Sequence, residues 1–192
     1  GLYQRFSSCN MDENSWLRKL FFQGNFFCAP SACVRKDIID KVGFYRYGLV
    51  QLQDFYLWLR VLLEAPVYII QEKLTWYRRF NEEGKNLSTI NANTQRRDLH
   101  ETQWICEDII KRISDEKFVK VFGIDMKNPN AKSEKEILCE KAFLLWKRGN
   151  CFAEKWFIEL LEDEEYRNIF ENKYHFGLQD FYKMNTETRY FG

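Results

Sequence analysis

The chain has 192 residues, of which 45% are hydrophobic and 17% aromatic, a composition that can bury one large core or two smaller ones. Its 29 lysine and arginine residues nearly balance 28 aspartate and glutamate residues, with no long block of like charge, which excludes a polycationic arm for nucleic acid. Charged residues and Pro66 interrupt the longest apolar runs, so we expect no transmembrane segment. The expected compartment is the cytoplasm, and a peripheral association with a membrane is left open.

The cysteines and histidines do not form a metal-binding motif. Six cysteines occur without a C-x-x-C pair, and His100 and His175 are the only histidines. Reduced, mostly buried thiols are the expected state, as in cytoplasmic proteins. We therefore predict no metal ligands in this chain.

The first part of the chain alternates short helices with extended segments. Amphipathic patterns with cap residues predict helices at residues 15–24, 36–43 and 53–65. Asn14 is the predicted N-cap of the first helix, and Gly24 its left-handed stop. β-branched and aromatic residues predict an extended segment at 25–35 and one or two strands at 67–79.

The second part is predicted to be helical almost throughout. A polar stretch at residues 81–93, rich in turn-forming residues, separates it from the first part. Helices are expected at residues 94–114, 115–123, 133–149 and 151–165. Ser133 and Glu136 have the spacing of a capping box, which places a helix start at Ser133. The break at Gly149 and Asn150 predicts that the two flanking helices pack as an antiparallel hairpin.

The pentapeptide LQDFY occurs twice, at residues 52–56 and 178–182. In both copies the aspartate, Asp54 or Asp180, lies in the first turn of a predicted helix, where a carboxylate accepts backbone N–H bonds. Capping alone explains Asp180. Asp54 differs because it precedes an aromatic and apolar stripe that begins with Trp58, one helical turn later.

Four sequence blocks, three in the stretch from Gly24 to Arg79 and one just after it, resemble the acceptor-side half of family-2 glycosyltransferases, inverting enzymes of the GT-A fold. They are GNFFCAPSACVRKDIIDKVGFY, QLQDFYLWLR, VYIIQEKLTWYRR and NLST. The later stretches RRDLHE and CEKAFLL are similar to the helical tail of some bacterial members. The resemblance implies an α+β, mostly helical fold, with residues 1–90 as the second half of a GT-A domain. Residues 91–192 are expected to form a helical C-terminal region.

The resemblance also implies roles for particular residues. In such enzymes an acceptor hydroxyl displaces the nucleoside diphosphate from a sugar with inversion, and the aspartate of the D-[FYW] helix is the general base. This role falls on Asp54. Acceptor binding falls on Asn25, Gln53 and Trp58, and donor binding on Arg78 and Arg79, whose cations could meet the diphosphate. A position in the core explains Trp58 equally well. Solvent-exposed positions at the end of a strand explain the two arginines equally well.

One motif that the family requires is absent from the sequence. The chain has no D-x-D pair, which holds a divalent metal and the nucleotide sugar, and no alternating βαβ pattern before Gly24. Mg²⁺ or Mn²⁺, a nucleotide sugar and a saccharide acceptor are thus expected only for a longer protein, and the chain alone is expected to be inactive. The first residue, Gly1, is not methionine, which favours a piece of something longer.

A second interpretation comes from a different class of function. The chain could be a non-catalytic interaction module built on a degenerate transferase fold, with a helical platform for a protein partner or a second copy of itself. Trp104, Trp146 and Trp156 are candidates for such a platform, although tryptophans at helical spacing more often fill a core.

Overall fold

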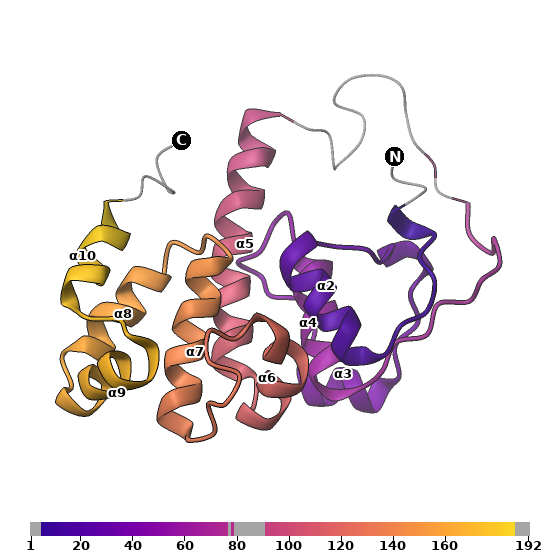
Figure 1. The fold of residues 1–192 in the computed structure, drawn as a ribbon. Coiled ribbons are helices and arrows are strands. Elements are labelled where there is room, and N and C mark those ends of the chain that lie inside the picture. Colours follow the sequence, from indigo (N-terminus) through magenta and orange to yellow (C-terminus); the bar gives the residue numbers. More distant parts are fainter. Residues whose placement is uncertain (1–4, 77, 79–90, 187–192) are drawn as a thin grey trace. The chain divides into compact units, whose positions relative to one another are not determined.

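The computed structural model describes residues 5–76, 78 and 91–186, and every regular element in this part of the chain is a helix (Figure 1). The chain divides into two compact units, residues 1–105 and 106–192, and the division falls inside helix α5 (Ala92–Arg112). The domain boundary predicted at residue 90 lies outside the described residues.

Before α5, the first unit contains the helices α2 (Glu13–Gln23), α3 (Lys36–Val42) and α4 (Gln53–Glu64), with a short 3₁₀ turn, η1 (Ala29–Ser31), between α2 and α3. The helix predicted at 15–24 is confirmed, but its N-cap is Asp12 rather than Asn14. The Asp12 carboxylate accepts the backbone N–H groups of Asn14 and Ser15, each at 3.0 Å. At the C-terminal end of α2, Gly24 has a φ of +84°, a positive value that glycine adopts without steric cost.

Packing of α2 against α4 forms the core of the first unit. The Phe27 ring lies between the two helices, with ring centroids 4.8 Å from Trp16 and 6.4 Å from Trp58. Trp16, Leu20 and Phe21 of α2 are fully buried. Trp16 and Phe21 of α2 and Trp58 of α4 therefore fill the core of this unit.

A buried arginine joins α3 to α4. The guanidinium of Arg60 donates hydrogen bonds to the carbonyl oxygens of Val42, Gly43 (3.2 Å) and Phe44 (2.7 Å) at the end of α3. It also lies over the ring of Tyr56, 4.4 Å from the centroid. The Arg60 guanidinium therefore supplies donors to carbonyl oxygens at the C-terminal end of α3, which have no hydrogen-bonding partner within that helix.

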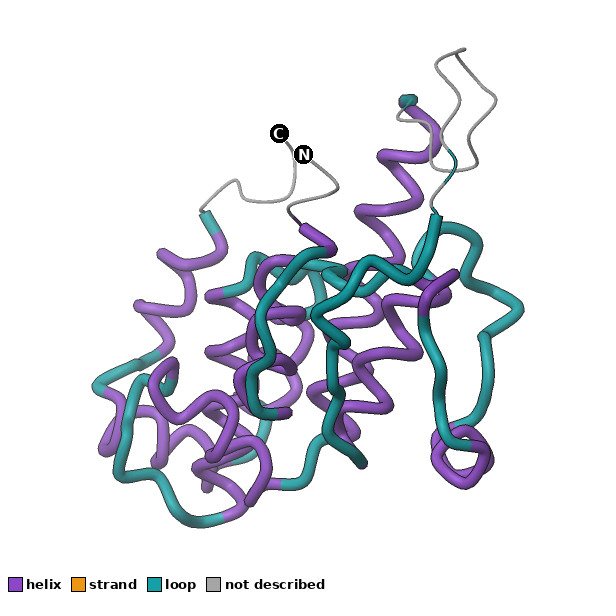
Figure 2. Tube along the Cα trace, turned by 90° about the vertical axis from the view of Figure 1, so that its right-hand side faces the viewer, coloured by secondary structure: helices purple, strands orange, loops and turns teal. Residues whose placement is uncertain are grey.

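The GT-A fold expected from the family resemblance is wrong. The described residues contain no strand (Figure 2), so this part of the chain is all-helical and not an α+β half of a transferase domain. The extended segment expected at 25–35 contains the η1 turn, and residues 67–76 form no ladder. Apolar, β-branched residues are only a local signal, whereas a strand needs a neighbour for its backbone hydrogen bonds.

The second unit is built from the end of α5 and a succession of shorter helices. These are α6 (Asp115–Phe122), η2 (Gly123–Asp125), α7 (Glu134–Lys147), α8 (Ala153–Leu161), α9 (Glu164–Tyr174) and α10 (Leu178–Asn185). The predicted capping box of α7 is confirmed, since the Ser133 hydroxyl accepts the N–H of Glu136 and the Glu136 carboxylate accepts that of Ser133. Helix α7 packs against α8 and α9.

Aromatic rings dominate the core of the second unit. The Phe143 ring of α7 lies 5.1 to 5.7 Å, between centroids, from four other rings. Those rings belong to Phe157, Phe170, Tyr174 and Phe176. They come from α8, α9 and the segment before α10, so one side chain of α7 organises the packing of its neighbours.

Two buried carboxylates, Glu107 of α5 and Glu140 of α7, bind other segments of the second unit. Glu140 of α7 is 1% exposed and accepts the backbone N–H groups of Lys127 and Asn128, both at 2.7 Å. Glu107 of α5 accepts the indole N–H of Trp156 at 3.0 Å. Each buried charge therefore has hydrogen-bonding partners, as burial requires.

Candidate functional site

Asp54, the predicted general base, lies in the first turn of α4 and forms two hydrogen bonds. Its Oδ2 accepts the side-chain N–H of Asn25 at 3.0 Å, and its Oδ1 accepts the backbone N–H of Phe55 at 2.7 Å. Burial raises the pKa of the Asp54 carboxyl above its ordinary value, against the opposing effect of these two hydrogen bonds. The side chain remains partly exposed to solvent.

Asn25 is brought to Asp54 by the turn that follows α2. Its Oδ1 accepts the backbone N–H of Phe27 at 3.0 Å, which orients the amide so that its NH₂ group points to Asp54. The backbone carbonyl of Asn25 accepts the Nε–H of Arg5 at 2.6 Å. Two of the predicted site residues, Asn25 and Asp54, are therefore in direct contact.

Among the other predicted site residues that the structure describes, no side chain is hydrogen-bonded to this pair. The Trp58 side chain is only 5% exposed and packs on Phe27, and its indole N–H has no partner among the described residues. Gln53 donates its side-chain N–H to the carbonyl of Val50 at 3.2 Å. Arg78 is exposed, and Arg79 lies outside the described residues. Their roles in acceptor and donor binding stay predictions.

Glu101 has a role in this unit that sequence analysis missed. Its carboxylate accepts the backbone N–H groups of three consecutive residues before α4, Val50, Gln51 and Leu52, at 2.7 to 3.1 Å. Leu52 is the N-cap of α4, so one of these bonds satisfies an N–H group at the helix start, and the carboxylate also meets the positive end of the helix dipole. No local sequence signal reveals it, because Glu101 belongs to α5 and its partners lie about fifty positions earlier.

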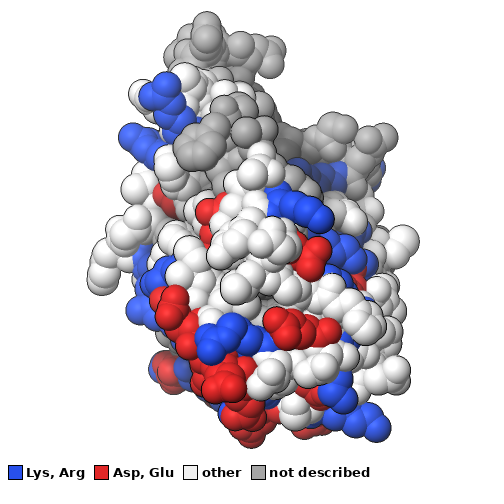
Figure 3. Space-filling view, turned by 60° about the vertical axis from the view of Figure 1, so that its left-hand side comes forward, with Lys and Arg blue, Asp and Glu red and all other residues white. Residues whose placement is uncertain are grey.

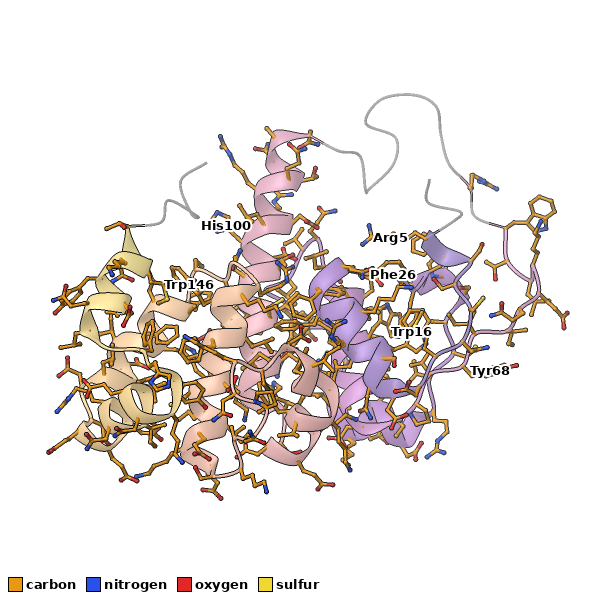
Figure 4. All side chains as sticks on the ribbon, in the orientation of Figure 1. Arg5, Trp16, Phe26, Tyr68, His100 and Trp146 are labelled. Atoms are coloured by element: carbon orange, nitrogen blue, oxygen red, sulfur yellow. The ribbon has the colours of Figure 1, made fainter. Side chains whose placement is uncertain are left out.

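A second feature of the first unit is the segment that leaves α4. Side-chain exposure alternates along residues 65–70, and Tyr68 and Ile70 are 76% and 57% exposed. Between them, Ile69 donates its N–H to Oδ1 of Asn10 at 2.6 Å, and its carbonyl accepts the Asn10 Nδ2–H at 2.8 Å. Tyr68 projects away from the helices of its unit (Figure 4).

The second unit contains a cavity of about 380 Å³. Phe143, Trp146 and Met184 contribute to its apolar wall, and Trp146 lies on the side of α7 that faces α10 (Figure 4). Asp180, the aspartate of the second LQDFY copy, lines this cavity and also accepts the N–H of Gly177 at 2.9 Å. Its predicted capping role is confirmed, but its position beside a cavity was not foreseen.

Two features are absent from the described part of the chain. The described residues contain no group of three or more histidine, cysteine, aspartate or glutamate side chains arranged to hold a metal ion. Among them, no helix has both the length and the apolar character that crossing a bilayer demands.

Comparison with protein families, curated proteins and solved structures finds no match to this chain. The resemblance to family-2 glycosyltransferases therefore has no support beyond the four quoted blocks, and the all-helical fold of the described residues contradicts it.

Proposed function

We propose that the chain is a non-catalytic protein-binding module that pairs residues 66–70 with an extended segment of a partner polypeptide. The observation that carries this proposal is the pair of hydrogen bonds between Ile69 and Asn10. The Asn10 amide donates to and accepts from one residue, as a neighbouring strand residue does in an antiparallel ladder. The segment is thus already bonded along one edge in the manner of a strand.

The described part of the chain leaves the opposite edge of the segment without hydrogen-bonding partners. Backbone groups of successive residues in an extended chain point to opposite edges, so those of Tyr68 and Ile70 face away from Asn10. Neither residue forms a backbone hydrogen bond within the described part of the chain. Addition of a strand to such an edge is a common mode of peptide recognition, in which main-chain bonds supply affinity.

The exposed side chains of the segment favour an apolar partner strand. Tyr68 and Ile70 are two positions apart and therefore project from the same face. Leu74 and Trp76 further along are 65% and 101% exposed. An uncovered edge with large apolar side chains is an aggregation hazard unless a partner covers it.

A pool of nine-residue peptides that alternate apolar and polar residues tests the proposal. We expect selected peptides to slow amide hydrogen exchange at Tyr68 and Ile70, measured by NMR, because strand pairing protects those N–H groups. Ile70→Pro should abolish binding, since proline has no N–H to donate. The matched variant Ile70→Thr keeps the N–H and a β-branched side chain, and should retain binding. Equal binding by both variants, or no binder in the pool, contradicts the proposal.

Sugar transfer is a second candidate function, favoured by the contact between Asp54 and Asn25. An amide that orients a partly exposed carboxylate can hold it in position to accept a proton from a hydroxyl. In this role Asp54 would deprotonate a saccharide acceptor, while a nucleotide sugar and Mg²⁺ or Mn²⁺ would be bound elsewhere in a protein that contains this chain.

The two aspartates of the repeated pentapeptide provide a matched test of the second candidate. In a protein that contains this chain, Asp54→Asn should abolish transfer from a nucleotide sugar and leave donor binding unchanged. Asp180→Asn should leave transfer intact. Unchanged transfer in Asp54→Asn, or equal loss in both variants, rules out Asp54 as the base. The chain by itself is expected to show no turnover.

A further inference from the structure

We propose that the cavity of the second unit binds a small organic monoanion with an aromatic body, of the aromatic carboxylate class. This site is independent of the strand-pairing edge, which belongs to the first unit. The cavity volume of about 380 Å³ lies in the range of small-molecule sites, which are mostly apolar with a few placed polar groups.

The wall of the cavity suits a flat apolar ligand. It is lined by Phe143 and Trp146 of α7, by Phe176 of the segment before α10 and by Met184 of α10. Aromatic faces and a thioether attract aromatic rings more strongly than they attract aliphatic groups of equal area. The apolar part of the ligand is therefore expected to be aromatic.

The charged groups at the cavity favour a single negative charge on the ligand. Three lysines, Lys127, Lys147 and Lys183, and two aspartates, Asp125 and Asp180, line it, which leaves one positive charge in excess. Lys147 is paired with Asp125 at 2.8 Å. Asp180 is already engaged as the acceptor of the Gly177 N–H.

Lys127 is the cation best placed to meet the ligand. Its ammonium lies 4.4 Å from the ring centroid of Phe143 and 5.0 Å from that of Phe176. It forms no ion pair within the described part of the chain. Burial lowers the pKa of the Lys127 ammonium, partly offset by attraction to the Asp180 and Glu140 carboxylates. A ligand carboxylate would supply the close negative partner that this ammonium lacks.

The backbone fixes the position of Lys127. Its N–H donates to the buried carboxylate of Glu140, and that contact anchors the segment between η2 and α7 to α7 itself. The backbone from which the Lys127 side chain extends is thus fixed before a ligand arrives, which reduces the entropy that binding costs.

The local contact with Lys127, rather than the electrostatic field of the whole protein surface, would select the anion. Figure 3 shows lysine and arginine side chains intermingled with aspartate and glutamate over the described part of one face. The chain carries a formal net charge of +1. Long-range steering of anions is therefore weak, and the contact with Lys127 must supply the selectivity.

The test compares 2-naphthoate with its neutral isostere 2-naphthamide by calorimetry and NMR. We expect 2-naphthoate to bind about tenfold more tightly than the amide, because only the acid forms a charge-assisted bond to Lys127. Lys127→Met should weaken binding of the acid about tenfold and leave binding of the amide unchanged. The control Lys155→Met changes an exposed lysine of α8 outside the cavity and should affect neither ligand.

Two results would overturn the proposal. One is equal affinity of the acid and the amide for the unaltered chain, and the other is failure of both to bind saturably up to their solubility limits. Circular dichroism of Lys127→Met establishes that the variant is folded. Methionine keeps the backbone N–H that bonds to Glu140 and most of the apolar stem, so the fold should be preserved.

Discussion

Asp54 and Asp180 occupy the same position in the repeated pentapeptide and have different surroundings. Asp180 is exposed and accepts the N–H of Gly177, the residue before its own helix. Asp54 is partly buried and accepts the amide N–H of Asn25, 29 positions away. Identical local sequence therefore specifies a helix start in both places, whereas the partner of each carboxylate depends on which other segment the fold brings to it.

Burial of Asp54 leads to a prediction about pH. Because the pKa of Asp54 is raised in the folded state, the folded chain holds this proton at pH values where the unfolded chain has released it. Its contribution to stability is therefore present below the ordinary aspartate pKa and is lost as pH rises through the folded-state value. In urea titrations, the free energy of unfolding relative to Asp54→Asn should fall as pH rises from below the ordinary aspartate pKa towards neutrality.

The opposite trend is expected for Asp37, which serves as the control. A hydrogen bond from Arg35 lowers the pKa of this exposed carboxyl. Its contribution is present above the ordinary pKa and is lost as pH falls through the lowered one. Relative to Asp37→Asn, the stability of the chain should thus rise with pH. A rise with pH for Asp54 as well would show that its pKa is not raised by folding.

Among the elements, α4 shows how one helix depends on another for its start. The N-cap of α4 is Leu52, which has no side chain able to accept a hydrogen bond. Glu101 of α5 provides the acceptor for the backbone before α4. By contrast, α7 carries its own capping box in Ser133 and Glu136. Local sequence rules located the start of α7 securely, but could not reveal what stabilises the start of α4.

Glu101→Gln should destabilise the first unit by about 1–3 kcal/mol, because charge-assisted bonds to three backbone N–H groups are weakened. Chemical denaturation measures the loss. Glu159→Gln, at an exposed position with an ion-pair distance of 3.6 Å to Lys155, is the control and should change stability by less than about 0.5 kcal/mol. Similar small effects of both substitutions would argue against the capping role.

At the scale of the whole molecule, the cysteines differ in how deeply they are buried. Cys106 and Cys139 are 1% and 0% exposed, whereas Cys9 and Cys33 are exposed. Burial raises the pKa of Cys106 to about 11 and that of Cys139 to about 12. Because the thiolate is the reactive form, both buried thiols should be inert at neutral pH in the folded chain.

Pulsed alkylation followed by mass spectrometry should therefore label Cys9 and Cys33 rapidly and Cys106 and Cys139 only after unfolding. The expected contrast is at least about a hundredfold in rate, since burial both blocks access of the reagent and lowers the thiolate fraction of Cys106 and Cys139. Rapid labelling of Cys139 in the native chain would contradict the burial of α7 against its neighbours. Labelling in urea, where all sites are accessible, provides the control.

The sequence by itself determined most helices of the described part of the chain, because helical hydrogen bonds, caps and apolar periodicity are properties of neighbouring residues. It misassigned residues 67–76, whose strand-like composition has no neighbouring strand among the described residues. Only the tertiary structure shows that Trp58 belongs to the core and that Glu101 binds the backbone before α4. It also shows that Lys127 and Asp180 line the same cavity. Those facts depend on contacts between distant segments, which no local pattern encodes.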